Sequence, residues 1–340
     1  MRRLRDGVLI CCLIGLGFVT LGELGARLFK TDDPAMVIAS PNPRLVYELN
    51  PAYQGINTLG MRDRELAVQP QPDVYTIAVI GDSHAYSISV KHREETFPAQ
   101  LEHALQARVS QPVRVLNFGV PGYNTAQELE VFRAKVVAWA PQLVVLQYCI
   151  NDTHICNYLQ PASPRLNAWL YKSTFLVRLW KNLLYSPFGS RYLFDWVSTY
   201  VPDALLFQPG LVGTRKAAPD EDLAHKPHPP RHPERVPARY HYMLGEAQWR
   251  QHVQQFAQVG QAHGIALLAT GFIEPTEQSV FVQAGFAVYT FADMFHGQDT
   301  RTYGYDPAYT AGHFNASGCV VIGTALADYI ARHYLLMPAP

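Results

Sequence analysis

The chain has 340 residues, of which 48% are hydrophobic, and its 28 lysines and arginines balance its 28 aspartates and glutamates. That apolar fraction is enough to build a large buried core. Because a nucleic-acid-binding surface needs an excess of positive charge, the balanced formal charge argues against nucleic acid as a partner.

The first 29 residues predict a membrane anchor. Arg2, Arg3 and Arg5 precede the run Gly7 to Gly22, which carries no charge. This run is near the short limit for a bilayer span, which takes about 17 to 25 residues. A signal-peptide core would look similar, but no small-residue cleavage site follows at a suitable distance, so an uncleaved anchor over residues 1–29 is favoured. Since basic residues stay cytoplasmic, we expect a single-pass inner-membrane protein whose main domain is periplasmic.

Residues 30–72 are rich in proline and asparagine, which predicts a linker followed by a lead-in to the main domain. Within them, the composition of Asn57 to Asp63 predicts a turn. The main domain is expected over residues 73–338, as a single large domain with an insertion.

From Tyr75 onward, short apolar runs alternate with amphipathic segments, which predicts a parallel sheet with helices on both faces. The expected fold class is α/β, with a flavodoxin-like doubly wound sheet. The predicted strands are Tyr75 to Ile80, Val113 to Phe118, Leu143 to Tyr148, Ile265 to Phe272 and Phe286 to Phe291. The predicted helices are Glu95 to Ala107, Thr125 to Trp139, Gly245 to His263 and Gly318 to Tyr334.

The sheet does not need the residues at about 160–244, so they are predicted to form a helical and loop insertion. Its first part, Leu166 to Val201, is rich in aromatic and basic residues. A pair of helices on the sheet, a lid over a pocket and a face on the membrane all fit this pattern. The second part, Gln208 to Tyr240, is rich in proline and charge, which favours a solvated loop over a metal site. Its histidines include His225, His228 and His232.

Four short motifs stand at strand ends or before the last helix. The first, Gly81-Asp82-Ser83-His84, puts a serine on a tight turn at the sheet edge where open α/β sheets hold their sites. The other three are Val113 to Thr125, Leu143 to Asp152 and Gly312 to Gly318. In order and placement these motifs resemble those of the SGNH hydrolase superfamily, also called GDSL-like lipases and acylhydrolases. With its predicted anchor and lead-in, the chain is similar to the membrane-anchored members of that family.

The resemblance implies a role for each matching residue. Ser83 would be the nucleophile, and His313 the general base that takes its proton and later returns it. The donors of the oxyanion hole would be the backbone N–H groups of Ser83 and Gly122 and the side-chain amide of Asn151. Such donors are aimed at charge that develops only in the tetrahedral intermediate. No cofactor and no metal is implied.

The third member of a catalytic triad is less well defined. The family usually has an acidic residue three positions before the histidine, where this chain has Thr310. Asp306 is the nearest upstream carboxylate and is the candidate that we carry forward, while Asp299 and Asp293 are more remote. A Ser-His dyad is the alternative, with Thr310 or a backbone carbonyl orienting the imidazole of His313.

The cysteines have no spacing typical of a metal site. Cys11 and Cys12 fall inside the predicted anchor, and Cys149 stands where the family usually has glycine. Free thiols are favoured, with Cys149 and Cys319 buried, and a disulfide between Cys149 and Cys156 is the alternative.

Ser83, His313 and the oxyanion donors that the resemblance implies predict a serine esterase or acylhydrolase. It would cleave a short O-acyl ester of an envelope glycan or a lipid-like substrate through an acyl-serine intermediate. An O-acyltransferase acting on a cell-envelope polysaccharide would use the same site. A non-catalytic glycan-binding module that has lost its acid is a third hypothesis. The expected partners are thus an acyl ester substrate, which includes an acylated glycan, and the membrane. The sequence implies no oligomeric state.

Overall fold

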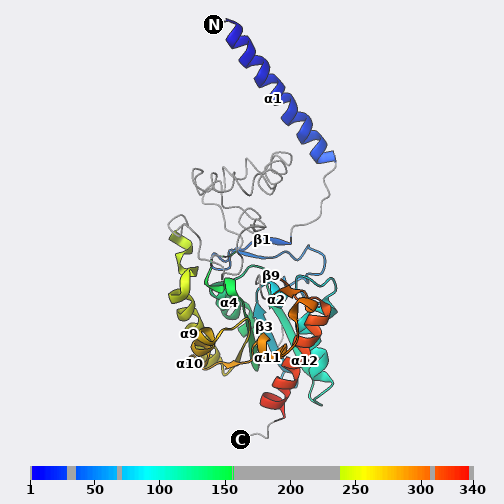
Figure 1. The fold of residues 1–340 in the computed structure, drawn as a ribbon, viewed down its shortest axis with the longest axis vertical. Coiled ribbons are helices and arrows are strands. Elements are labelled where there is room, and N and C mark those ends of the chain that lie inside the picture. The colour runs from blue at the N-terminus through cyan, green and yellow to red at the C-terminus, as the bar shows by residue number, and fades with distance from the viewer. Residues whose placement is uncertain are drawn as a thin grey trace. The chain divides into compact units, whose positions relative to one another are not determined.

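The computed structural model describes residues 2–28, 36–66, 71–154, 156, 238–306 and 311–336. Contacts divide the chain into two compact units (Figure 1). One comprises residues 1–34 and 158–221, and the other comprises residues 35–157 and 222–340. The predicted insertion, with its aromatic stretch and its histidines, lies almost entirely outside the described residues.

The described part of the first unit is one helix, α1 (Arg2–Leu28). Large apolar side chains such as Leu13, Ile14 and Leu21 are exposed on it. Over the ranges that the structure describes, however, no helix combines the length and the apolar character that a membrane span requires. The predicted anchor is therefore a helix, and its insertion in a membrane stays a prediction.

The second unit contains a five-stranded parallel sheet with the order β4-β3-β5-β6-β7. Counted along the sheet, this is the 2-1-3-4-5 order of flavodoxin-like folds, which confirms the predicted fold class. The strands formed by residues 75–81, 113–119 and 143–148 are buried along almost their whole length because helices cover both faces. The strands are β3 (Tyr75–Gly81), β4 (Val113–Gly119), β5 (Leu143–Tyr148), β6 (Ala266–Gly271) and β7 (Ala287–Val288).

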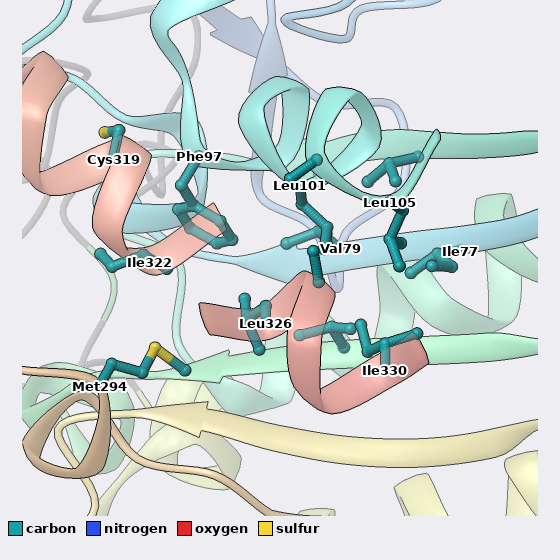
Figure 2. Close-up of a cluster of buried hydrophobic side chains, with 14 of the residues drawn as sticks. Ile77, Val79, Phe97, Leu101, Leu105, Met294, Cys319, Ile322, Leu326 and Ile330 are labelled. Carbon is teal, nitrogen blue, oxygen red and sulfur yellow. The ribbon is translucent and has the colours of Figure 1, made fainter. Parts of the chain in front are cut away.

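Helices α3 (Phe97–Gln106) and α12 (Ala316–Ile330) pack on one face of this sheet. They approach closely at Gly323, where a Cβ atom would lie 2.8 Å from the Leu101 backbone nitrogen. Apolar side chains from both helices and from β3 fill the core, and among them are Ile77, Val79, Leu101, Leu105, Leu326 and Ile330 (Figure 2).

A second group of helices contains α4 (Thr125–Val131) and α9 (Gly245–His263). The rings of Phe132 and Phe256 stack between them with centroids 4.8 Å apart. The chain after α4 stays helical through η2 (Phe132–Val136) and η3 (Val137–Trp139), as predicted for Thr125 to Trp139. Among the described residues, the remaining helices are α2 (Ser83–Tyr86), α10 (Pro275–Gln283), α11 (Phe291–Met294), η1 (Arg93–Glu95), η4 (Ile150–Thr153), η7 (Ala238–Met243), η8 (Thr300–Tyr303) and η9 (Ala331–Leu335).

The last strand of the sheet is shorter than predicted. Phe286 to Phe291 was the expected range, but β7 spans only Ala287–Val288 and Phe291 begins helix α11. The cause is Thr290, whose hydroxyl accepts a hydrogen bond from the Asp293 backbone N–H and caps the helix. This local cap overrides the strand preference of the aromatic residues.

Residues 36–66 belong to the same unit as the sheet. They form a small antiparallel pair, β1 (Val37–Ala39) and β2 (Tyr47–Leu49). The guanidinium of Arg62 donates to the backbone carbonyls of Tyr86, Ser87 and Val90. The lead-in thereby holds the loop that follows the first motif.

Candidate active site

Ser83 stands at a tight turn between β3 and α2. Asp82 caps this helix, and its carboxylate accepts a hydrogen bond from the His84 backbone N–H at 2.8 Å. Only glycine fits at the end of the neighbouring strand, because a Cβ at Gly119 would lie 2.3 Å from the Tyr86 backbone nitrogen. Helix α2, whose first residue is Ser83, can therefore pack closely on the end of β4.

His313 is 230 residues further along the chain, and its Nε2 lies 2.7 Å from the Ser83 Oγ. It follows the strand β9 (Ala311–Gly312) and precedes α12, whose N-cap is Asn315. A hydrogen bond of this length is what a serine nucleophile needs from its base. The structure thus brings together the two residues that the sequence motifs single out.

The imidazole of His313 lies in an environment that keeps it neutral. Burial lowers the pKa of His313 below its ordinary value. Its ring stacks on that of His84, with centroids 4.6 Å apart and an angle of 30° between the planes. Burial is the main cause that lowers the pKa of His84 well below its usual range, and the nearby His313 lowers it further. A neutral imidazole is the form that can accept the Ser83 proton.

The predicted oxyanion donors come from the ends of three adjacent strands, β4, β3 and β5. Gly122 follows β4 and has a φ of 77°, a conformation that favours glycine. Asn151 lies in η4 after β5, and its Nδ2 donates to the Tyr123 carbonyl at 3.2 Å. Since parallel strands end at one edge of the sheet, Ser83, Gly122 and Asn151 share that edge.

The candidates for the acid are placed differently. Asp306 lies in β8 (Tyr305–Asp306), and its backbone pairs with that of Ala311, two residues before His313. The Asp306 side chain and residues 307–310, which include Thr310, lie outside the described residues. Asp306 therefore stays a prediction as the third member of the triad.

The two remoter aspartates have other partners. Asp299 accepts hydrogen bonds from the Arg301 guanidinium and caps η8, while Asp293 bonds to Thr290. Both carboxylates are thus engaged in local structure.

Buried carboxyl groups surround the motif residues. Burial raises the pKa of Asp82 to about 6, although the hydrogen bonds that its carboxylate accepts lower this pKa. Burial and the charge of Asp82 raise the pKa of Asp152 well above its usual range, although its Oδ2 accepts a hydrogen bond from the Thr125 hydroxyl at 3.0 Å. Burial and the charges of Asp152 and Asp82 do the same to Glu128. We expect at least part of this group to be protonated near neutral pH.

The sequence motifs assign no role to two polar residues near the site. The Gln147 side-chain oxygen accepts hydrogen bonds from the Asp82 and Ala85 backbone N–H groups, at 3.3 and 2.9 Å, and so braces the serine turn. Glu128 lies fully buried in the first turn of α4. A polar side chain inside the apolar run of β5 was a visible signal for Gln147, whereas no pattern marked Glu128.

The cysteines are free thiols, as favoured from the sequence. Cys149 and Cys156 are both buried and no disulfide joins them. Burial raises the pKa of Cys149 well above its ordinary value, so its thiol is not a competing nucleophile. Within the described ranges, no group of metal-ligating side chains could hold an ion.

A serine paired with a histidine at the carboxyl edge of a doubly wound parallel sheet defines a serine hydrolase of the α/β class. The family model described as GDSL-like Lipase/Acylhydrolase matches residues 79–319, which include every motif residue discussed above. The chain belongs to this family, and it is an ester-cleaving serine hydrolase.

Several solved structures are similar to this chain at low sequence identity. "Crystal Structure of TesA" has 15% identity and a TM-score of 0.41, with 77% of this chain and 99% of that chain covered. The psychrotrophic esterase EstA from Pseudoalteromonas sp. has 10% identity and a TM-score of 0.40, with 76% and 97% covered. Axe2, an acetylxylan esterase from Geobacillus stearothermophilus, has 10% identity and a TM-score of 0.39, with 80% and 98% covered. No match was found among curated proteins.

Proposed function

We propose that the protein removes a short O-acyl group from an envelope glycan or a lipid-like ester through an acyl-serine intermediate. The observation that carries the proposal is the 2.7 Å contact between the Ser83 hydroxyl and the His313 Nε2. It pairs a nucleophile with a base whose pKa is lowered by burial, which favours the neutral imidazole that can accept a proton.

The reaction begins when Ser83 Oγ attacks the ester carbonyl carbon while His313 Nε2 takes the hydroxyl proton. The electron pair of the carbonyl π bond moves to its oxygen, and the N–H groups of Ser83 and Gly122 and the amide of Asn151 stabilise the resulting oxyanion. When this intermediate collapses, the bond to the alcohol oxygen breaks and His313 protonates the leaving alcohol. Water then attacks the acyl-serine with His313 again as base, which releases the acid and restores the hydroxyl.

The cellular site forms a second part of the proposal. We place the hydrolase domain on the outer side of the cytoplasmic membrane, held there by the N-terminal segment. The support is the uncharged run Gly7 to Gly22 after Arg2, Arg3 and Arg5, together with exposed apolar side chains such as Leu13 on α1. Fractionation of cells that express the full chain, followed by protease treatment of spheroplasts, tests it. Recovery of the intact protein in the soluble fraction would contradict this placement.

The substrate is tested with a series of nitrophenyl esters from acetyl to long acyl chains, alongside acetylated glycans. A sharp acetyl preference, and release of acetate from a glycan, supports the proposal, and a long-chain optimum contradicts the short acyl group. Adding an acceptor polysaccharide to a mass-tagged acyl donor separates hydrolysis from transfer. Acyl groups captured by the polysaccharide in preference to water would identify a transferase instead.

A further inference from the structure

The lead-in strand β2 lies against the loop that carries Gly122. The Tyr47 hydroxyl donates a hydrogen bond to the Pro121 carbonyl at 2.9 Å, and the Tyr123 hydroxyl donates one to the Tyr47 carbonyl. The two rings meet edge to face with centroids 4.9 Å apart. Tyr47 is 2% exposed and Tyr123 is 1% exposed, so these bonds are shielded from water. They join residues that are 74 and 76 positions apart in the chain.

The bond from Tyr47 acts on the peptide unit that contains the Gly122 N–H. In a planar trans peptide, the carbonyl of one residue and the N–H of the next belong to one rigid unit and point in opposite directions. A donor that holds the Pro121 carbonyl therefore fixes the direction of the Gly122 N–H. Within the described part of the chain, no protein acceptor takes that N–H, so it is free to face a substrate.

We propose that Tyr47 is a positioning residue for catalysis, which holds the Gly122 N–H in the direction that a developing oxyanion requires. The inference rests on the proposed role of Gly122 in the oxyanion hole. Besides orienting the peptide, a hydrogen bond to a carbonyl polarises the amide and makes its N–H a better donor. Both effects act more on the charged intermediate than on the neutral ester.

Further contacts hold β2 rigidly enough for this role. The Gln127 side-chain amide donates to the Leu45 carbonyl at 2.6 Å, and Lys135 forms an ion pair with Glu48. Both partners come from the helical segment that follows the Gly122 loop. On the opposite side, the Asn151 amide donates to the Tyr123 carbonyl. Tyr47 is thus part of a continuous set of bonds that includes two of the three proposed oxyanion donors.

The test is the Tyr47→Phe variant of the full chain, which removes the hydroxyl and keeps the ring. Loss of one buried hydrogen bond predicts a fall in kcat of about tenfold with KM unchanged. The matched control is Tyr329→Phe, the same change near the far end of α12, where the ring stacks on Tyr289. This control is expected to retain the kcat of the unmodified protein.

An alkyl boronic acid distinguishes positioning from a merely structural role, because its tetrahedral adduct with Ser83 places an oxygen in the oxyanion hole. We expect Tyr47→Phe to weaken its binding by the same factor as kcat/KM. Unchanged kcat and boronate affinity in a folded Tyr47→Phe protein would overturn the inference. A Ser83→Ala variant that retains activity would instead refute the proposed function itself.

The companion variant Tyr123→Phe guards against failure of Tyr47→Phe to fold. It removes the hydrogen bond to the Tyr47 carbonyl and is expected to lower kcat by about threefold, again without a change in KM. If Tyr47→Phe does not fold and Tyr123→Phe keeps full kcat, the inference is overturned. A fall in kcat that is matched by weaker boronate binding supports it.

Discussion

The nucleophile side and the base side of the site are held in different ways. Gln147, on the neighbouring strand β5, accepts hydrogen bonds from the backbone of the serine turn, and Asp82 does so from within the turn. His313 instead follows the two-residue strand β9 and rests with its ring on His84. The sheet therefore determines where the nucleophile lies, whereas the base depends on a loop and a ring stack. Substitutions near His313 therefore test which group orients its imidazole.

The largest effect on kcat is expected from Asp306→Asn. If Asp306 orients His313, this change is expected to lower kcat by up to about 10⁴-fold, as loss of the orienting aspartate does in a serine protease. Steady-state kinetics with an acetyl ester measures it. Asp299→Asn, which alters a carboxylate bound to Arg301, is the matched control and is expected to retain activity. Full activity of Asp306→Asn would contradict the triad and identify a Ser-His dyad. In that dyad the His313 ring would still stack on His84.

A smaller effect is expected on the nucleophile side from Asn151→Ala. It removes one neutral donor from the proposed oxyanion hole, which predicts a fall in kcat of about 100- to 1000-fold with little change in KM. Asn151→Asp keeps the shape but replaces the donor with a carboxylate, so we expect its loss to be at least as large. A thermal melt of each variant checks folding. If kcat stays within a few fold for both variants, Asn151 has no part in stabilising the oxyanion.

The smallest effect concerns pH. Burial lowers the pKa of His313, so the neutral base persists to a lower pH than an exposed histidine would allow. The rate constant kcat/KM should fall only as the pH drops through this lowered pKa, with a midpoint below about 6.5. Measuring kcat/KM with an acetyl ester over a range of pH values gives this midpoint. A midpoint clearly above that value would show that another group controls activity, or that His313 is not the base.

Much of the fold could be predicted because its signals are local. The apolar runs of β3, β4 and β5 are typical of buried parallel strands, and the glycines that follow them indicate turns. The positions of Ser83 and His313 followed from motif order. The end of β7 was predicted wrongly because a cap at Thr290 outweighs strand preference. The contact of Tyr47 with Pro121 spans 74 residues, and no local pattern can indicate such a pairing.

The central claim, that Ser83 is a nucleophile activated by His313, is tested most directly by labelling with a fluorophosphonate probe. Mass spectrometry of the labelled, folded protein should find the phosphonyl group on Ser83. The rate of labelling should fall sharply in His313→Ala, while Ser83→Ala should take up no label. Absence of label from the folded unmodified protein, or equal labelling rates with and without the imidazole of His313, would contradict the account.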